Sequence, residues 1–110
     1  MKRFDVVIVN FDPSVGHEIK KTRPCVIVSP DEMNAVLKTI QVVPVTSTIR
    51  TLPTRILIKA CPKSGLDHDS QAALDQLKTI DKSRVQTSIG EISENEKDDI
   101  VNTLLKMFSR

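Results

Sequence analysis

Residues 16–28 read Gly-His-Glu-Ile-Lys-Lys-Thr-Arg-Pro-Cys-Val-Ile-Val, a basic loop that runs directly into a short apolar strand. Pro24 fixes its own φ at about −65° and disfavours the α region for the residue before it, so we expect Arg23 to be extended where the strand begins. A guanidinium is permanently charged and offers a planar fork of donors that fits a phosphate. The stretch therefore predicts a rigidly placed cation for an anionic ligand, although a solvated charged loop would have a similar composition.

Short β-branched runs on both sides of this stretch predict a mainly β protein. The expected strands cover residues 5–11, 23–29, 37–45, 55–59, 73–79 and 86–92, with single helical turns near 29–34 and 81–85. Pro44 is expected to put the end of its strand at an edge or a bulge, and Gly90 to mark a bulge or a close approach. The strands are too closely spaced for helical crossovers, so we expect an antiparallel sheet curled into a small barrel with long loops.

One long amphipathic helix is expected at the C-terminal end of the chain. Ser93 and Glu96 have the spacing of a capping box, and further acidic residues crowd the first turns, where the helix dipole favours negative charge. An apolar stripe at helical spacing is expected to pack on the sheet; it comprises Ile100, Val101, Leu104, Leu105 and Phe108.

Length and composition fit one domain over residues 1–110, with one modest core. No apolar run approaches the roughly 20 residues that cross a membrane, and the N-terminal residues lack the apolar segment of a signal peptide. Cys25 and Cys61 lie far apart in the sequence and have no Cys-x-x-Cys partner. They are typical of reduced, partly buried thiols in a cytoplasmic protein.

The distribution of charge is compatible with a nucleic-acid surface. Residues 1–60 carry nine basic and five acidic side chains, whereas residues 61–110 carry seven basic and nine acidic ones. The chain has three phenylalanines and no tryptophan or tyrosine, which argues against a surface that grips RNA mainly by stacking bases on aromatic rings. We therefore expect contacts with nucleic acid to rest on phosphates and hydrogen bonds.

Residues 16–29 resemble the signature segment of the MazF/PemK (Kid) mRNA interferases, which are toxins of type II toxin–antitoxin modules. The resemblance continues in register through residues 5–13, through Pro44-Val-Thr-Ser-Thr48, and through Ser70, residues 74–81 and Ile89-Gly90. It thus covers nearly the whole chain.

This resemblance implies the SH3-like barrel of the CcdB/PemK toxins, with a C-terminal helix, in a homodimer. It implies sequence-specific cleavage of single-stranded RNA without a metal or other cofactor, leaving a 2′,3′-cyclic phosphate and a 5′-hydroxyl, and so inhibition of translation and growth. The implied partners are the RNA substrate and a cognate MazE/PemI-type antitoxin, with DNA bound only through the antitoxin complex.

The resemblance also assigns the catalytic residues. The family's essential arginine falls on Arg23, its essential threonine or serine on Thr46, and an acidic residue implicated in some members on Glu18. The Kid-like branch uses an arginine and an aspartate two residues apart; here the aspartate is Asp75, but the arginine position is Ala73.

The chemistry of in-line cleavage agrees with this assignment, because the phosphorane formed by 2′-hydroxyl attack needs a cation and fixed donors where its charge grows. Arg23 supplies the cation and Thr46 a hydroxyl. Glu18 and Asp75 are candidate bases, although each is equally explained as a salt-bridging loop carboxylate. The residues expected to contact RNA are His17, Lys20, Lys21, Thr22, Ser47, Thr48, Arg50, Arg55 and Gln76. No cluster of ligand residues has metal-binding spacing.

Two other functions remain open at this point. The first is a CcdB-like toxin without catalytic activity that poisons DNA gyrase, and the second is a plain nucleic-acid-binding module of SH3-like shape. Cleavage of RNA in the presence of a chelator separates the enzyme from both.

Overall fold

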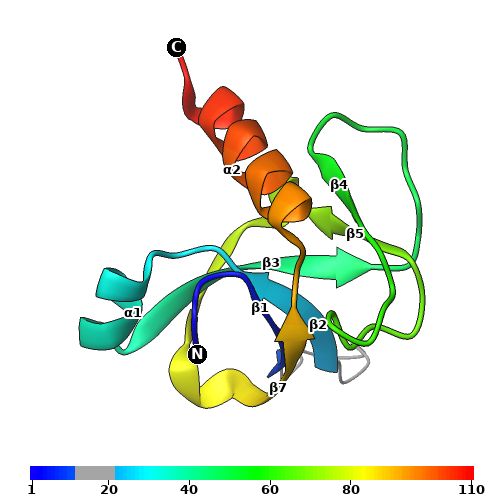
Figure 1. Ribbon diagram of the computed structural model, residues 1–110. Helices are drawn as coiled ribbons and strands as arrows, with labels where there is room; N and C mark the ends of the chain where they lie inside the picture. Colours follow the sequence, from blue (N-terminus) through cyan, green and yellow to red (C-terminus); the bar gives the residue numbers. More distant parts are fainter. Residues whose placement is uncertain (12–21) are drawn as a thin grey trace, which may run out of the picture.

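A single antiparallel sheet of seven strands forms the body of the molecule in the computed structural model, which describes residues 1–11 and 22–110 (Figure 1). The strands are β1 (Asp5–Asn10), β2 (Thr22–Ile27), β3 (Thr39–Thr46), β4 (Arg55–Ile58), β5 (Ser70–Ala73), β6 (Lys78–Asp81) and β7 (Val85–Glu91). Their order is β4-β5-β3-β2-β1-β7, and β6 also pairs with β3. The helices are α1 (Asp31–Val36) and α2 (Glu94–Phe108), and two 3-10 turns are η1 (Leu74–Gln76) and η2 (Lys82–Arg84).

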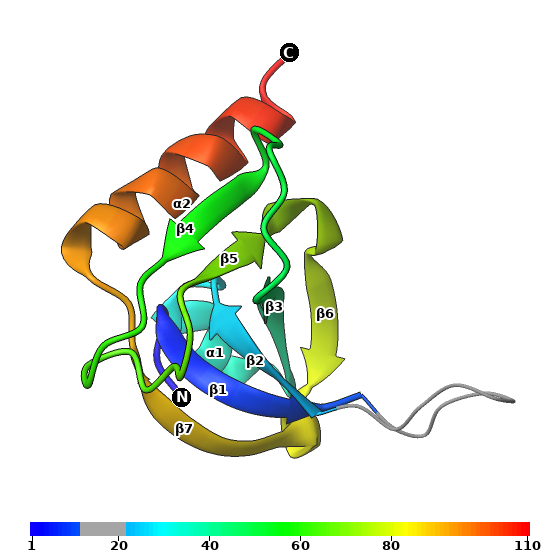
Figure 2. The ribbon, with the colours of Figure 1, turned by 90° about the vertical axis from the view of Figure 1, so that its right-hand side faces the viewer.

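The sheet curls around itself, as expected for an SH3-like barrel (Figure 2). The pairings among the described residues leave β4 and β7 at the ends of the order, so the barrel is open. Strand β3 is the centre of the arrangement, since it pairs with β2 on one side and with both β6 and β5 on the other.

Two clusters of buried side chains fill the two faces of the sheet. The first lies between the sheet and α2 and includes Val43, Val45 and Ile100, all at most 3% exposed. The second fills the concave face and comprises Val7, Val9, Cys25, Ile27, Ile40, Val42 and Ile80. Because side chains alternate along a strand, this division also fixes which polar residues face which side.

The link between β5 and β6 differs from the expected strand over residues 73–79. Strand β5 ends at Ala73, η1 follows, and β6 begins only at Lys78. The break lets one segment pair with β3 twice, at Val45 and Thr46 through β5 and at residues 39–42 through β6. Leu74 is fully buried where the strand ends. Its packing in the core therefore favours the turn η1 over a continuous strand.

Helix α2 begins with the expected capping box. The Glu96 amide donates to Ser93 Oγ at 3.3 Å, and the Ser93 amide donates to Glu96 Oε1 at 2.9 Å. The second oxygen of Glu96, Oε2, accepts a hydrogen bond from the Lys59 amide at 2.9 Å, next to the end of β4. One carboxylate therefore caps the helix and ties it to the edge of the sheet.

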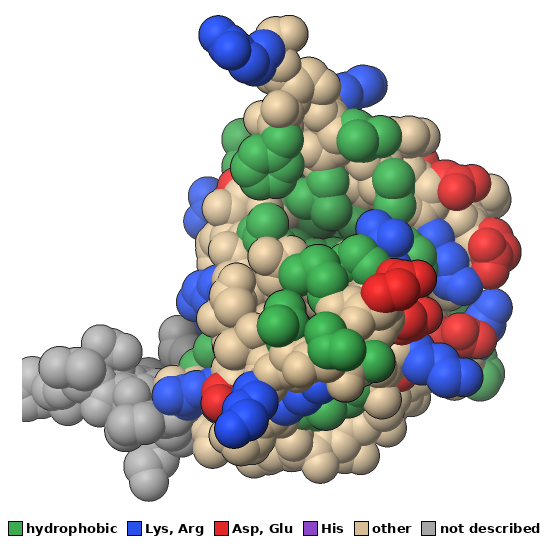
Figure 3. Space-filling model, turned by 90° about the vertical axis from the view of Figure 1, so that its left-hand side faces the viewer, with side chains coloured by type: hydrophobic (Ala, Val, Ile, Leu, Met, Phe, Trp, Pro, Cys, Tyr) green, Lys and Arg blue, Asp and Glu red, His purple; other side chains and the backbone are tan. Residues whose placement is uncertain are grey.

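The apolar stripe of α2 packs on the sheet only in part. Ile100 is fully buried and Leu104 and Met107 are partly buried, but Leu105 and Phe108 are 63% and 70% exposed, which corrects the expectation for these two residues. Exposed hydrophobic side chains also occur on and after α1, at Met33, Val36 and Leu37. On the face that carries α1, hydrophobic side chains form a band below the C-terminal end of the chain (Figure 3).

Two further expectations concern glycine and cysteine. Gly90 is a point of close approach, because a Cβ there would lie 2.2 Å from the carbonyl oxygen of Lys63. Both cysteines are free thiols: Cys25 is buried, as expected, but Cys61 is exposed. Within the described residues, no helix has the length and apolar character needed to cross a membrane.

Candidate active site

Arg23 and Thr46 lie on neighbouring strands and on the same face of the sheet. Cys25 pairs with Pro44 in the β2–β3 ladder, and this register continued by two residues brings Arg23 opposite Thr46. Alternation gives the same result, because Cys25 and Val42, which belong to the concave cluster, share a face with Arg23 and Thr46 respectively. Both residues are half-buried at the rim of that cluster, where their polar groups can meet a ligand.

The hydroxyl of Thr46 is oriented by the turn that follows it. The Thr48 amide donates to Thr46 Oγ1 at 3.1 Å, so one acceptor position of that oxygen is occupied. The hydroxyl proton is not used in this bond and can be donated to an anion. Thr46 thus has the properties required of a fixed hydrogen-bond donor at the end of β3.

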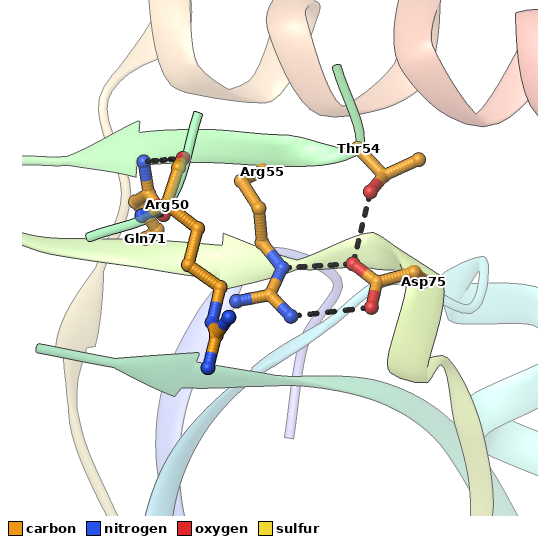
Figure 4. Close-up of polar contacts among 5 residues, drawn as sticks. All are labelled: Arg50, Thr54, Arg55, Gln71 and Asp75. Carbon is orange, nitrogen blue, oxygen red and sulfur yellow. Dashed lines mark hydrogen bonds and ion pairs between the residues drawn. The ribbon is translucent and has the colours of Figure 1, made fainter. Parts of the chain in front are cut away.

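An ion pair between Arg55 and Asp75 lies on the same face. Nε and Nη2 of Arg55 donate to the two carboxylate oxygens of Asp75 at 2.8 and 3.2 Å, and the Thr54 hydroxyl donates to Asp75 Oδ1 at 2.9 Å (Figure 4). The Arg55 side chain is only 7% exposed, so this guanidinium is held in one place.

The contact changes the acidity of both partners. The hydrogen bonds from Arg55, with a smaller contribution from Thr54, lower the pKa of Asp75 to about 2, and Asp75 in turn raises the pKa of Arg55. A carboxylate with so low a pKa is a weak base near neutral pH. The geometry therefore favours Asp75 as the group that orients Arg55.

Arg55 also relates to the arginine of the Kid-like pattern, which is absent from position 73 of this chain. Arg55 is the direct cross-strand partner of Ala73 in the β4–β5 ladder. A side chain directly opposite another lies about 5 Å from it at Cβ, which explains how a guanidinium from β4 reaches the carboxylate that follows β5. In this chain a guanidinium thus contacts Asp75 although position 73 is an alanine.

Gln71 is a polar residue of this face that the sequence analysis did not identify. It pairs with Thr46 in the β3–β5 ladder and is 8% exposed. Its side-chain amide accepts a hydrogen bond from the Arg50 amide at 2.9 Å and donates one to the Arg50 carbonyl oxygen at 3.0 Å (Figure 4). The available signal is its position as the only long polar side chain in a short strand of small residues.

The remaining expected site residues fall into two groups. His17, Glu18, Lys20 and Lys21 lie outside the described residues. The others are exposed: Thr22 at the start of β2, Ser47, Thr48 and Arg50 in the loop after β3, and Gln76 in η1. Among residues 1–11 and 22–110, no group of three or more histidine, cysteine or acidic side chains is arranged to hold a metal ion.

Comparisons with known proteins show the family to which the chain belongs. Residues 2–108 match the family described as PemK-like, MazF-like toxin of type II toxin-antitoxin system. Endoribonuclease MazF9 of Mycobacterium tuberculosis is 36% identical over 99 residues, covering 84% of this chain and 83% of that protein. Endoribonuclease MazF of Staphylococcus saprophyticus is 31% identical over 106 residues, covering 94% and 88%.

Solved structures show the same fold. The MazE-MazF complex (Form-II) from Deinococcus radiodurans superposes with a TM-score of 0.81 at 25% identity, covering 97% of this chain and 94% of that one. The Mycobacterium tuberculosis toxin MazF-mt6 gives a TM-score of 0.79 at 23% identity, covering 94% and 95%. The expected fold class is therefore confirmed, and the chain belongs to the PemK-like, MazF-like toxins of type II toxin–antitoxin systems.

Proposed function

We propose that the chain is an endoribonuclease toxin that cuts single-stranded RNA at a short sequence, by attack of a ribose 2′-hydroxyl on the adjacent phosphate. The observation that carries this proposal is the placement of Arg23 and Thr46 on one face of neighbouring strands, at the rim of the concave cluster. Its relatives named endoribonuclease support it. The products are a 2′,3′-cyclic phosphate and a 5′-hydroxyl, and the loss of mRNA stops translation and growth.

Arg23 and Thr46 stabilise the transition state. As the 2′-oxygen adds to phosphorus, negative charge grows on the non-bridging oxygens, and a guanidinium and a hydroxyl held ready require no reorganisation to meet it. Arginine is a poor proton donor because its pKa exceeds about 12, so we assign Arg23 to electrostatic stabilisation first. The 2′ proton then needs a base.

Glu18 is the base that we favour over Asp75. Asp75 accepts three hydrogen bonds and has a pKa of about 2, which leaves it little basicity near neutral pH. We assign Asp75 to positioning Arg55, whose guanidinium then faces the RNA backbone. This arrangement gives the site a second cation beside Arg23.

Further charged and polar side chains contact the RNA. Phosphates are met by Arg50, Arg55 and the two lysines of the first loop, Lys20 and Lys21. Hydroxyls, amides and one imidazole can bond to base edges; these come from His17, Thr22, Ser47, Thr48 and Gln76. Such contacts suit a single strand, whose bases are open to hydrogen bonding.

The molecule works with partners in the cytoplasm. A second copy of the chain forms a homodimer, supported by the hydrophobic side chains left exposed on α2 and beside α1, since apolar patches of this kind mark interaction surfaces. A cognate MazE/PemI-type antitoxin neutralises the toxin, supported by the MazE-MazF complex among the structures that share the fold. DNA is bound only through that antitoxin complex.

The decisive experiment is incubation of the purified protein with a single-stranded RNA library in EDTA, followed by sequencing of the 5′ ends of the fragments. Cleavage to 5′-hydroxyl ends at one short motif supports the proposal and identifies that motif. Dependence on Mg²⁺ would instead indicate a metal-activated nucleophile. Intact but bound RNA would favour a plain binding module, and inert RNA with inhibited gyrase would favour a CcdB-like toxin.

A further inference from the structure

Gln71 is the only long polar side chain of β5, a strand in which all four residues are buried. A buried amide needs hydrogen-bond partners, and in a sheet those usually come from neighbouring strands. Here both partners are main-chain groups of Arg50, in the exposed loop between β3 and β4. The side chain therefore reaches out of the sheet to hold a loop.

The two hydrogen bonds give this loop an anchor in its middle. At its start, the Thr48 amide is bonded to Thr46 Oγ1, and at its end the Arg55 amide donates to the Leu52 carbonyl oxygen at 3.1 Å. Between these points, Gln71 pairs with Arg50 through an N–H···O bond in each direction, as a neighbouring strand would. The position of the Arg50 main chain is thus set from within the sheet.

Fixing the main chain of Arg50 also fixes the point from which its side chain projects. The guanidinium groups of Arg50 and Arg55 both point toward β3 (Figure 4). Arg55 is paired with Asp75, whereas the guanidinium of Arg50 has no ion-pair partner among the described residues. A cation that has no ion pair within residues 1–11 and 22–110, placed beside a paired one near Thr46, suits a phosphate.

We propose that Gln71 is a positioning residue for substrate, which holds Arg50 so that its guanidinium contacts a phosphate of the bound RNA strand. This inference rests on the proposed function, since it needs RNA on this face. It assigns to Gln71 a part in RNA binding that acts entirely through Arg50. A purely structural glutamine would instead affect folding without changing how many phosphates are neutralised.

The test measures binding of an RNA oligonucleotide of mixed sequence with 2′-O-methyl groups throughout, which lacks the attacking hydroxyl. For single strands, the slope of log affinity against log salt changes by about 0.7 for each phosphate that a protein neutralises. We expect Gln71→Met, which keeps the length of the side chain and removes both hydrogen bonds, to reduce the slope by about 0.7. Arg50→Ala should give the same reduction, and the double variant should give no more.

A second readout follows the loop directly. In the wild-type protein, hydrogen exchange of the Arg50 amide should be slowed by its bond to Gln71, and Gln71→Met should accelerate it while the amides of β3 stay protected. Gln86→Met, at an exposed position of β7, is the matched control and should change neither readout.

Each outcome decides one question. An unchanged Arg50 amide in Gln71→Met, or a salt slope that falls further in the double variant, overturns the inference and leaves the proposed function standing. A wild-type protein that binds no RNA overturns the proposed function and with it the role of Gln71 in binding, even if the amide result shows that the side chain holds the loop.

Discussion

Arg23 owes its placement to its neighbours in the sequence and in the sheet. Pro24 follows it and favours an extended backbone, and the pairing of Arg23 with Val9 in the β1–β2 ladder fixes it from the other side. The side chain therefore emerges at a fixed point beside Thr46. A rigid starting point matters because an error of about 1 Å at a reacting centre can cost roughly 100-fold in rate.

Replacement of Arg23 by alanine should remove most of the cleavage activity and leave the fold intact. Loss of one fixed charge or donor at a developing oxyanion costs about 3 kcal/mol, which corresponds to a fall in kcat of roughly 100-fold or more. Single-turnover cleavage of a labelled RNA and a thermal melt measure the two effects. Arg110→Ala, at the exposed end of the chain, is the control and should behave as wild type. Undiminished cleavage by Arg23→Ala would remove this residue from the mechanism.

The low pKa of Asp75 predicts how Asp75→Asn should behave across pH. The folded-state pKa lies below the ordinary value, so the carboxylate contributes stability that is present at neutral pH and is lost as pH falls toward about 2. The melting temperature of Asp75→Asn should lie below that of wild type at pH 7, and the gap should close through the acid range. A gap that stays constant down to the acid limit would mean that the ion pair is not the cause.

The same variant separates the two roles considered for Asp75. If Asp75 orients Arg55, Asp75→Asn and Arg55→Ala should weaken RNA cleavage in the same way, and neither should move the acid limb of the pH–rate profile. If Asp75 were the base, that limb would disappear in Asp75→Asn. The pH dependence of kcat, measured for all three proteins, distinguishes these outcomes.

At the level of elements, the close contact between β7 and the loop after β4 places a strict demand on Gly90. A Cβ at this position would lie 2.2 Å from the Lys63 carbonyl oxygen and 2.5 Å from the Ser64 carbonyl carbon, both of which are main-chain atoms that cannot rotate away. The ladder between β1 and β7 also shifts its register between Val6 and Val7, next to Gly90. The contact therefore depends on the absence of a side chain.

Gly90→Ala should destabilise the protein by about 1–3 kcal/mol, the usual cost of forcing an extra carbon into a packed site. Chemical denaturation measures the change in the free energy of unfolding. Ser88→Ala, an exposed position on the same strand, provides the control and should stay within about 0.5 kcal/mol of wild type. Equal stability of the two variants would show that the loop at residues 63–64 moves aside without cost.

The elements that the sequence predicts well are those whose signals are local. The β-branched runs gave β1, β2 and β4 to within two residues, and the spacing of Ser93 and Glu96 gave the start of α2. The segment after Ser70 was predicted wrongly because its conformation is set by β3, a partner that is distant in sequence. The burial of Leu74 accompanies the break between β5 and β6, and no pattern in the neighbouring sequence indicates it.

The candidate site divides in the same way. The family resemblance nominated Arg23 and Thr46, and the register of β2 and β3, continued by two residues, places them on one face of the sheet. The contacts of Arg55 with Asp75 and of Gln71 with Arg50 join residues about 20 positions apart across a loop, and only the folded sheet brings them together. Exposure of Leu105 and Phe108 was missed because helical periodicity defines a stripe but not how far the sheet extends beneath it.

At the scale of the whole molecule, the positive charge of one face predicts that RNA and the antitoxin compete for it. Arg23 and Arg55 share the face that carries Thr46, and the guanidinium of Arg50 points toward the same strand, β3 (Figure 4). The basic first loop precedes Arg23 in the sequence. An acidic, partly disordered antitoxin segment could occupy this face and fold as it binds. Toxin inhibition would then result from direct occupation of the site.

We expect the cognate antitoxin and RNA to exclude one another. Titration of antitoxin into a complex of the toxin with 2′-O-methyl RNA should release the RNA completely, and added salt should weaken both complexes because both depend on the same cations. Fluorescence anisotropy of the labelled RNA follows the release. A ternary complex with both ligands bound at full affinity would contradict this picture.

Glu96 bridges two elements, and this has a consequence for how the protein unfolds. Its two oxygens serve the first turn of α2 and the edge strand β4 at once. Separation of α2 from the sheet would break the contact of Glu96 with Lys59 and disturb the N-cap of the helix at the same time. The separated segment would therefore not remain helical. Undocking and unfolding of α2 thus become one cooperative event. A protease or chaperone would encounter the C-terminal segment either packed on the sheet or fully unfolded.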